Sequence, residues 1–420
     1  MLKSNAAKAM PSVSQPSNYT RVDKCRAGGG EMVDVLSLGD QAMTGIFPKP
    51  GEHVDVAPLT LAWSPTSGLL QLRHSCSLPE MYGDNYGYRT GLNKAMVQHV
   101  ERKVFALRKH CKPGDIVLDI GSNDGTLLGF YPNEVQCVGI DPTAKKFARF
   151  YKPGIDVVPS FFSAAAFRDV VGNKKAKVIT SLAMFYDLED PVAFAREVAE
   201  CLAPDGVWHL EMHYLGAMLR DGVYDSIVHE HLEYYSFTSL VNVLRQSGLV
   251  LRDVTMNDVN GGSMTVTVGH RAETGEKPFA EWLLREEVIG GLHLKQAYDH
   301  YAFRIANHRE SLTNLLEHIR MQGKSIIAYG ASTKGNVVLQ YCGIGPDLVS
   351  AVAEVNPDKF GCVTPGTNIP IISEAEARAM KPDYFLVLPW HFRSGIIERE
   401  REFLSNGGKM IFPFPAIEVV

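Results

Sequence analysis

The sequence predicts an α/β protein with two parallel sheets, each covered by helices, behind a small β-rich N-terminal module. Short apolar runs alternate with helical patterns over residues 116–212, and a second alternation begins at residue 325. A long and largely polar helical pattern over residues 276–322 separates the two. Strands that alternate with helices along a chain are typical of parallel sheets buried on both faces.

The composition is that of a globular protein and excludes several classes. The chain has 420 residues, 45% hydrophobic and 21% charged, which is enough for two or three domains with their own cores. A formal net charge of -5 gives no general attraction to a phosphate backbone, so we expect no nucleic-acid partner. No apolar run reaches the ~20 residues that span a bilayer, so we expect no membrane partner. The sequence indicates no oligomeric state.

The cysteines and the N-terminal residues predict a cytoplasmic protein. Seven cysteines are scattered singly, which suits a reducing compartment and predicts no disulfide. The first residues lack the apolar centre of a signal peptide. Residues 1–20, rich in Ser, Pro and Asn, are expected to form a flexible lead-in.

The remaining chain divides into four parts. Residues 21–80 are expected to form the β-rich module, with strands near 33–36, 59–63 and 68–72. Residues 81–275 form the first α/β domain, residues 276–322 a helical connector, and residues 323–420 the second α/β domain. In the first domain we expect strands at 116–121, 135–140, 177–181 and 207–212, and helices at 92–110, 126–130, 144–150, 164–171 and 191–202.

A glycine-rich turn over residues 119–125 follows the first of these strands and favours a particular ligand. It lacks the third glycine of a dinucleotide fingerprint and the Gly-Lys-Ser/Thr of a phosphate loop. The next strand ends in Asp141, about 20 residues on, where a carboxylate accepts hydrogen bonds from a ribose diol. Acids at Asp119 and Asp124 suit a positively charged ligand such as S-adenosylmethionine. The alternative is a structural turn with solvated acids.

These observations give a set of candidate cofactor-binding residues at the edge of the sheet. Aromatic side chains near the ends of later strands could enclose an adenine, or could equally belong to the core. The candidates are Asp119, Gly121, Asn123, Gly125, Asp141, Pro142, Phe162, Ser181 and Met184.

Histidine, glutamate and tyrosine crowd together over residues 224–236. The two histidines of the triplet, His229 and His231, are two residues apart, whereas a zinc-protease helix needs them four apart. An imidazole beside a carboxylate suits proton transfer near neutral pH, so this cluster predicts a general base. The alternative is that these histidines are structural.

Four segments together resemble one known family. Residues 81–93, the turn 119–125, the triplet His229-Glu230-His231 and the segment 330–336 (Gly-Ala-Ser-Thr-Lys-Gly-Asn) occur in this order in the S-adenosylmethionine-dependent C-methyltransferases of nucleotide-linked 4-keto-deoxysugars. The chain is similar to that family from about residue 24 to its end. The resemblance implies a class I methyltransferase Rossmann-like domain and a second Rossmann-like domain that binds the nucleotide sugar.

The resemblance also implies roles for individual residues. His231 would remove the proton beside the sugar ketone, with Glu230 next to it, a tyrosine at 86 or 88 near the sugar, and His229 as a further catalytic candidate. Where relatives often carry a tyrosine ahead of the triplet this chain has Val228, so that hydroxyl role is absent or moves to another tyrosine. The substrate-binding candidates are Asn93, Tyr186, Tyr224, Ser332, Thr333, Lys334 and Asn336.

The segment 330–336 follows a predicted strand and opens a helix. Its N–H groups and Lys334 could therefore meet a diphosphate, or it could be a structural turn.

The N-terminal module departs from the family pattern. Relatives carry two C-x-x-C pairs that bind zinc, whereas here the corresponding segments are 25–28, with Cys25 alone, and 64–67, without a cysteine. One thiolate cannot hold a structural zinc ion, so we predict no zinc and a module stabilised by apolar packing.

The sequence therefore predicts a methyltransferase that uses S-adenosylmethionine to methylate a carbon of a nucleotide-linked keto-sugar. Two alternatives remain at this stage. One is an O- or N-methyltransferase that acts on a small metabolite, and the other is a non-catalytic protein that binds S-adenosylmethionine or a sugar nucleotide.

Overall fold

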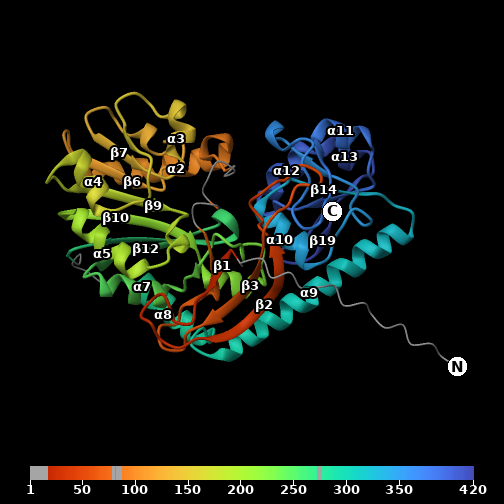
Figure 1. Ribbon diagram of the computed structural model, residues 1–420, viewed down its shortest axis with the longest axis horizontal. Coiled ribbons are helices and arrows are strands. Elements are labelled where there is room, and N and C mark those ends of the chain that lie inside the picture. The colour runs from red at the N-terminus through yellow and green to blue at the C-terminus, as the bar shows by residue number, and fades with distance from the viewer. Residues whose placement is uncertain (1–17, 78–80, 82–87, 272–276) are drawn as a thin grey trace.

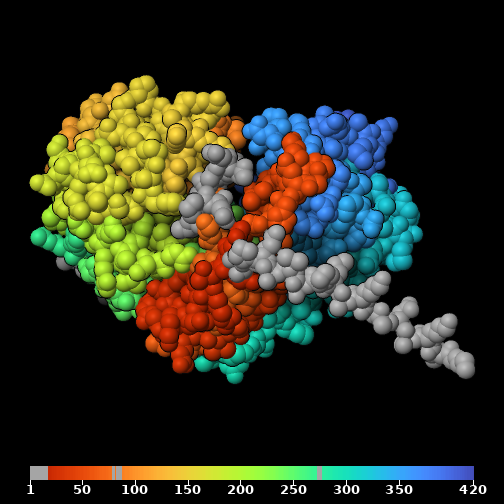
Figure 2. Space-filling model, viewed as in Figure 1, coloured from red at the N-terminus to blue at the C-terminus, as the bar shows by residue number. Residues whose placement is uncertain are grey.

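The computed structural model describes residues 18–77, 81, 88–271 and 277–420 (Figure 1). A seven-stranded sheet lies on one side of the molecule and a six-stranded sheet on the other. A four-stranded N-terminal sheet and the long helix α9 run along one edge and join the two (Figures 1 and 2). The candidate Tyr86 lies outside the described residues.

The seven-stranded sheet confirms the Rossmann-like fold expected for the first α/β domain. Its order is β12-β13-β10-β9-β6-β7-β8; the five strands from β10 to β8 are parallel, and β13 runs antiparallel to β10. Strand β6 is buried throughout because four of its five residues are apolar. The strands are β6 (Ile116–Ile120), β7 (Gln136–Ile140), β8 (Asp156–Val158), β9 (Ala176–Leu182), β10 (Leu202–His213), β12 (Val250–Asn257) and β13 (Ser263–Gly269).

The helices of this domain begin at side chains that cap their first turn. The side chains of Asn93, Ser163 and Asp190 accept hydrogen bonds from backbone N–H groups of α2, α4 and α5, which would otherwise lack partners. The helices are α2 (Lys94–Leu107), α3 (Ala144–Phe147), α4 (Ala164–Val171), α5 (Pro191–Cys201), α6 (Leu215–Asp221) and α7 (Phe237–Gln246).

Two predicted helices are shorter than expected. The predicted helix at 126–130 is wrong, since only a 3₁₀ turn (Leu128–Phe130) forms there. The turn before it extends through Gly125, whose φ is +72°, so no regular helix can begin at residue 126. The predicted helix at 144–150 divides into α3 and a 3₁₀ turn (Ala148–Phe150).

The C-terminal domain has a second mainly parallel sheet, as the sequence predicts. Its order is β16-β15-β14-β17-β18-β19, and only β19 runs antiparallel to its neighbour. The strands are β14 (Ile326–Tyr329), β15 (Val352–Glu354), β16 (Ile371–Ser373), β17 (Tyr384–Val387), β18 (Lys409–Phe412) and β19 (Glu418–Val419). The helices are α10 (Thr333–Tyr341), α11 (Glu374–Ala379), α12 (Arg393–Arg399) and α13 (Arg401–Ser405).

The connector consists of two helices, α8 (Pro278–Ile289) and α9 (Lys295–Met321). Gly290 and Gly291 follow α8, and Gly291 has a φ of +71°, which ends the helix. Helix α9 passes beneath β2 and reaches the C-terminal domain (Figure 1). Along this path it buries one face, including Tyr298, Ile305 and Leu312.

The N-terminal module forms a sheet that includes a strand from the first α/β domain. Its order is β11-β4-β3-β2, and β11 (Glu233–Tyr234) follows the His-Glu-His triplet directly. The module's other strands are β1 (Tyr19–Arg21), β2 (Val33–Ala42), β3 (Val56–Trp63), β4 (Leu70–Leu72) and β5 (His74–Cys76). The triplet is therefore held by both the first α/β domain and the N-terminal module.

The module shares one hydrophobic core with α6, α9 and the C-terminal domain. Trp63 of β3 packs against Tyr298 of α9, with 5.1 Å between ring centroids. The Sγ of Cys25 lies 3.1 Å from the hydroxyl oxygen of Ser67. In the part of the chain that the structure describes, no group of three or more His, Cys, Asp or Glu side chains is placed to hold a metal ion. Shared apolar packing thus stabilises this thin module.

None of the helices within the described ranges combines the length and the apolar character that crossing a bilayer requires.

Candidate active site

A cavity of about 510 Å³ lies between the two α/β domains, where the carboxyl ends of both parallel sheets meet. It is lined by side chains from α2, from the ends of β6, β7, β9 and β10, and from the segments after β14 and β17. Fourteen of the predicted site residues lie in its wall: Tyr88, Asn93, Gly121, Asn123, Asp141, Pro142, Phe162, Met184, Tyr186, Glu230, His231, Ser332, Thr333 and Lys334.

Asp141 organises one end of the cavity. Its Oδ2 accepts a hydrogen bond from the backbone N–H of Asn123 at 2.8 Å, and its Oδ1 accepts from the N–H and hydroxyl of Thr143, both at 2.6 Å. Asn123 has a φ of +50° and Gly121 a φ of +76°, so the turn curls tightly over the strand end. The carboxylate is thereby fixed at the edge of the cavity with lone pairs left for a ligand.

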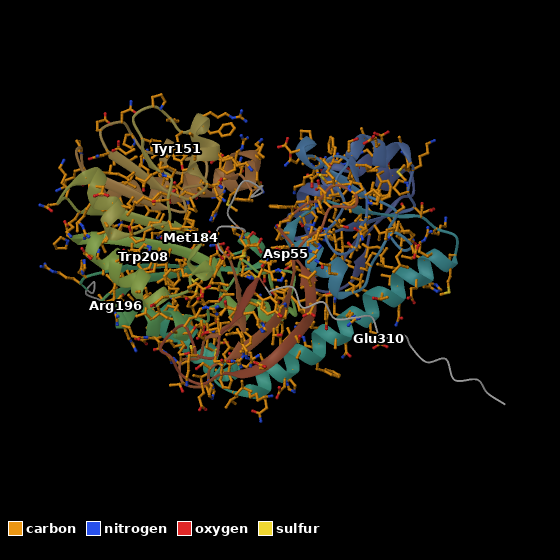
Figure 3. The ribbon with its side chains drawn as sticks, viewed as in Figure 1. Asp55, Tyr151, Met184, Arg196, Trp208 and Glu310 are labelled. Carbon is orange, nitrogen blue, oxygen red and sulfur yellow. The ribbon has the colours of Figure 1, made fainter. Side chains whose placement is uncertain are left out.

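Apolar side chains continue the wall beside Asp141. Pro142, Phe162 and Met184 line this part, and Phe162 packs edge-on against Phe194, with 5.1 Å between ring centroids. Figure 3 places Met184 toward the centre of the molecule, on the side of the first domain that faces the other modules. A flat aromatic base would be enclosed by such surfaces.

Three cofactor candidates lie outside the cavity wall. Asp119 is buried in β6 and accepts a hydrogen bond from Thr180; burial raises its pKa to about 7 despite that bond. Ser181 is fully buried and accepts a hydrogen bond from Trp208. Gly125 packs beneath the ring of Tyr151. Asp119 and Ser181 lie within β6 and β9, and Gly125 lies in the turn after β6, so all three belong to the framework behind the cavity wall.

His231 is a histidine of the cavity wall, and its hydrogen bonding defines its tautomer. Its Nδ1 lies 2.8 Å from the carbonyl oxygen of Ser226, and its ring contacts that of Tyr186, with 4.4 Å between centroids. A carbonyl oxygen only accepts, so Nδ1 carries the proton and Nε2 retains a lone pair. Burial and the charge of Lys334 lower the pKa of His231 to about 3, so the ring is neutral.

Glu230 lies at a contact between all three modules. A Cβ built on Gly45 of the N-terminal module would lie 2.5 Å from its Oε1 and 3.9 Å from the hydroxyl oxygen of Thr333. Its Oε2 is buried and has no hydrogen-bond partner within the described residues. Burial raises the pKa of Glu230, which favours the protonated acid.

The other predicted catalytic and substrate residues have different positions. His229 is buried, and its Nε2 lies 3.1 Å from the carbonyl oxygen of Ala57 in β3. The hydroxyl of Tyr224 contacts His308 and Cys342 in the core. The side chain of Asn336 donates to the carbonyl of Thr44 at 2.7 Å, so it fastens the N-terminal module to α10. Tyr88 lines the cavity and is 47% exposed.

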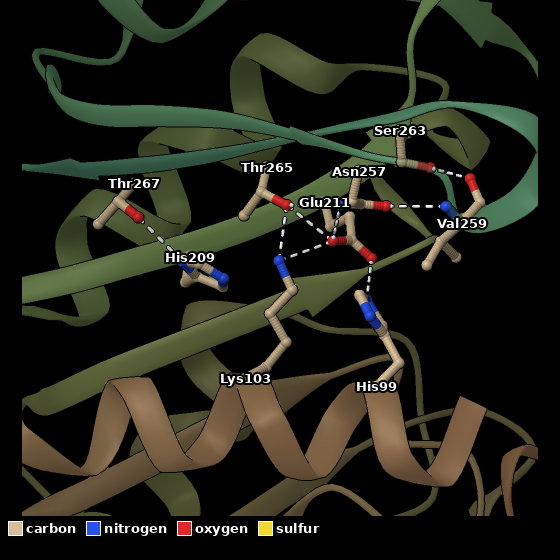
Figure 4. Close-up of polar contacts among 9 residues, drawn as sticks. All are labelled: His99, Lys103, His209, Glu211, Asn257, Val259, Ser263, Thr265 and Thr267. Carbon is tan, nitrogen blue, oxygen red and sulfur yellow. Dashed lines mark hydrogen bonds and ion pairs between the residues drawn. The ribbon is translucent and has the colours of Figure 1, made fainter. Parts of the chain in front are cut away.

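Sequence reasoning missed a polar network on the far wall (Figure 4). Glu211, at the end of β10, lies 2.6 Å from the Nε2 of His99 and 2.7 Å from the Nζ of Lys103, both on α2. Asn257 and Thr265 also donate to its Oε2. Burial opposes ionisation of Glu211, but the bond from His99 and the charge of Lys103 lower its pKa to about 2. The network holds α2 against the sheet.

The sequence feature that could have indicated a site role for Glu211 is its position, as a polar residue, at the end of a predicted strand. No sequence pattern indicated that His99 and Lys103, a hundred residues earlier, would meet it.

A second cavity, of about 930 Å³, is lined by residues of all three modules. The segment 88–93 contributes to both cavities. The guanidinium of Arg89 lies 3.9 Å from the ring centroid of Phe150, and the Nζ of Lys359 lies 4.0 Å from that of Phe47. Lys146 and Arg149 add two further cations to the wall.

Comparisons with known proteins agree with this architecture. Residues 258–415 match a family model described as the C-methyltransferase C-terminal domain, and residues 89–254 match a methyltransferase domain. The C-methyltransferase NovU of Streptomyces niveus is 30% identical over 410 residues, which cover 95% of this chain and 97% of NovU. The chain belongs to the C-methyltransferase family. It is an enzyme of the methyltransferase class, and S-adenosylmethionine is its cofactor.

Other similar proteins match a smaller share of the chain. A tRNA U34 carboxymethyltransferase of Campylobacter lari is 31% identical over 108 residues, which cover 24% of this chain and 36% of that protein. Among solved structures, the mitomycin 7-O-methyltransferase MmcR is 15% identical with a TM-score of 0.34, covering 43% of this chain and 55% of its own. An S-adenosylmethionine-dependent methyltransferase of Clostridium acetobutylicum is 12% identical with a TM-score of 0.30, covering 41% and 89%.

The cavity of this C-methyltransferase fits S-adenosylmethionine. The fixed carboxylate of Asp141 suits the ribose diol, and the apolar wall beside it suits the adenine. When bound, the cofactor supplies an electrophilic methyl group on a sulfonium. The residues of the chain then have to bind it, exclude water and generate a nucleophile on the acceptor.

Proposed function

We propose that this C-methyltransferase methylates a carbon beside the ketone of a sugar linked to a nucleoside diphosphate, and that His231 is the general base. The observation that carries the proposal is the neutral imidazole in the cavity wall, whose Nδ1 is held by Ser226 and whose Nε2 keeps a lone pair. A carbon acceptor needs such a base, because its C–H proton must leave before the carbon can attack a methyl group.

A ketone acceptor fits the surroundings of His231. The hydrogen beside a carbonyl is acidic, because the electron pair left behind is shared with the carbonyl oxygen. Glu230, whose pKa is raised by burial, and the hydroxyls of Tyr186 and Thr333 offer polar groups to sugar oxygens in the same cavity. Tyr88, Asn93 and Ser332 complete the candidate sugar-binding wall.

The second cavity supports a charged nucleotide as the remainder of the substrate. Arg89, Lys146, Arg149 and Lys359 supply positive charge beside three acids, Glu52, Asp55 and Asp358. Phe47, Phe147 and Phe150 supply rings for a base. The segment 88–93 borders both cavities, so a substrate that follows it would place its sugar near His231 and its nucleotide among these cations. A cytoplasmic location is supported by seven cysteines that form no disulfide.

The test is incubation of the protein with S-adenosylmethionine and thymidine, uridine or guanosine diphosphate-linked 4-keto-6-deoxyhexoses. We expect one product with a mass increase of one methylene, whose new methyl group is bonded to a sugar carbon by NMR. A product methylated on oxygen or nitrogen would replace the proposal with the corresponding activity. Cofactor binding without any methylated product would indicate a binding protein.

A further inference from the structure

Lys334 has an unusual position for a lysine. It is the second residue of α10, and its side chain lines the same cavity as His231 and Glu230. Among the residues that the structure describes, its Nζ makes one hydrogen bond, which is long, at 3.4 Å to the carbonyl oxygen of Asn260. Burial lowers its pKa, and the charge of Asp225 opposes this. An ammonium group in a cavity wall with one long hydrogen bond can still donate to an oxygen atom of a ligand.

The charged and titratable groups around Lys334 come from four elements. Asp225, from the loop after α6, is fully buried; its Oδ2 accepts from the indole of Trp390 at 2.7 Å, and its Oδ1 has no partner among the described residues. Burial lowers the pKa of His213, His231 and His391, and the charge of Lys334 adds to this effect at each imidazole. Lys334 and His231 thus line the same cavity, and Asp225 is an acid whose charge acts on Lys334.

Two N–H groups of the turn before α10 already have acceptors. The N–H of Ala331 donates to the carboxylate of Glu354 at 2.9 Å, and the N–H of Gly335 donates to the hydroxyl of Ser332 at 3.0 Å. The other oxygen of Glu354 accepts from the N–H groups of Val355 and Asn356. The charge of Glu354 disfavours a diphosphate beside this turn, and Lys334 lines the cavity that contains His231.

We propose that the ammonium group of Lys334 hydrogen-bonds to the ketone oxygen of the substrate and stabilises the enolate that forms when His231 removes the neighbouring proton. This inference rests on the proposed function and assigns a catalytic role within it. Asp225 acts as a positioning residue, because its charge opposes the effect of burial on the pKa of Lys334.

The step balances in protons and electrons. The Nε2 lone pair of His231 takes the proton from the carbon beside the ketone. The electron pair of the broken C–H bond forms a carbon–carbon double bond, and the carbonyl π pair moves to oxygen. The oxygen gains a negative charge next to Lys334 while His231 becomes positive. Before that step, burial and the charge of Lys334 keep the pKa of His231 low; afterwards the enolate charge offsets that of the lysine and allows His231 to hold the proton.

The test measures proton transfer alone, without S-adenosylmethionine. Wild-type protein in D₂O with the keto-sugar nucleotide that is its substrate should exchange the hydrogen beside the ketone, which mass spectrometry follows as a gain of one mass unit. Lys334→Met should reduce the maximal exchange rate by about 100-fold or more, as the loss of an oxyanion donor does. Lys334→Arg should recover part of the rate, and Lys409→Met, an exposed lysine of the same domain, should match wild type.

Binding measurements separate this role from the alternatives. Lys334→Met should bind thymidine or uridine diphosphate as wild type does; a tenfold loss of that affinity, with exchange restored at saturating substrate, would assign Lys334 to phosphate binding and overturn the proposal. An unchanged exchange rate would also overturn it. The double variant Asp225→Asn/Lys334→Met removes both charges and should show the same loss if the single variant folds poorly. If wild-type protein neither exchanges nor methylates any keto-sugar nucleotide, the proposed function fails instead.

Discussion

The Nδ1 of His231 lies 2.8 Å from the carbonyl oxygen of Ser226, five residues earlier in the chain. This one bond fixes the ring orientation and its tautomer, so the lone pair of Nε2 is available before any ligand binds. The segment that carries both residues continues into β11, which pairs with β4 of the N-terminal module. The proposed base is therefore held rigidly, and its role can be tested by small changes around it.

Replacement of His231 by Asn should remove the base while keeping an N–H donor for the carbonyl oxygen of Ser226. We expect hydrogen exchange beside the ketone to fall by about 10²–10⁴-fold, which is the usual contribution of a general base. Affinity for S-adenosylhomocysteine, measured by calorimetry, should not change. Exchange at the wild-type rate would show that another group removes the proton.

Asp141→Asn should weaken cofactor binding, because a hydrogen bond to a charged group contributes about 1.5–3 kcal/mol. We expect the dissociation constant of S-adenosylhomocysteine to rise at least about tenfold. The constant for 5′-methylthioadenosine should rise equally, since that ligand keeps the ribose. Asp169→Asn, an exposed carboxylate on α4, is the matched control and should bind as wild type does. Equal affinities for all three proteins would place the ribose elsewhere.

Gly45→Ala tests whether the N-terminal module shapes the active site. The new methyl group would lie 2.5 Å from Oε1 of Glu230, so the carboxyl group must move. A displacement near 1 Å at a catalytic site costs up to about 100-fold in rate, and we expect a loss of that order with a melting temperature close to wild type. Gly345→Ala adds a methyl group with no heavy atom within 4 Å and should keep full activity.

Glu211→Gln should destabilise the fold by about 3–5 kcal/mol, because Lys103 would lose its buried counter-charge. The folded-state pKa of Glu211 is depressed to about 2, so the stability from its ionisation is present above pH 4.5 and is lost as the pH falls toward 2. Urea unfolding at pH 7 and at pH 3.5 should therefore show a smaller difference between variant and wild type at the lower pH. A constant difference would contradict the assigned ionisation.

Chelation should leave the N-terminal module intact. With Cys25 alone beside Ser67, we expect elemental analysis to find no zinc and EDTA to leave the melting temperature unchanged. Stoichiometric zinc in the purified protein would show that other ligands replace the missing thiolates.

Trp63→Ala should lower the free energy of unfolding by about 3–5 kcal/mol, because it opens a cavity in the core shared with α9.

Much of the fold could be predicted because local pattern and final structure agree. The strands near 116–121 and 177–181 are short apolar runs that can be buried only in a sheet, and both form as expected. The helix at 164–171 begins and ends where predicted, since Ser163 caps it and Gly172 ends it with a φ of +66°. Such signals act within a few residues and are visible in the sequence.

The site could be predicted only in part, because side-chain direction depends on distant contacts. Tyr224 and Asn336 stand in the predicted segments, yet one packs against Cys342 and the other bonds to Thr44. Glu211 and His99 face the cavity because α2 crosses the end of β10, a relationship between segments 112 residues apart. No local pattern encodes such a meeting.

The pairing of β11 with β4 has a consequence for how relatives of this enzyme can diverge. Two hydrogen-bonded residues after the triplet complete a sheet whose other strands belong to the first part of the chain. A chimera that takes its amino-terminal third from one homologue and the rest from another would pair β4 of one protein with β11 of the other beside the proposed acceptor site. Acceptor preference should therefore be inherited as a property of the whole chain, and recombination should favour exchange of complete genes over exchange of single modules.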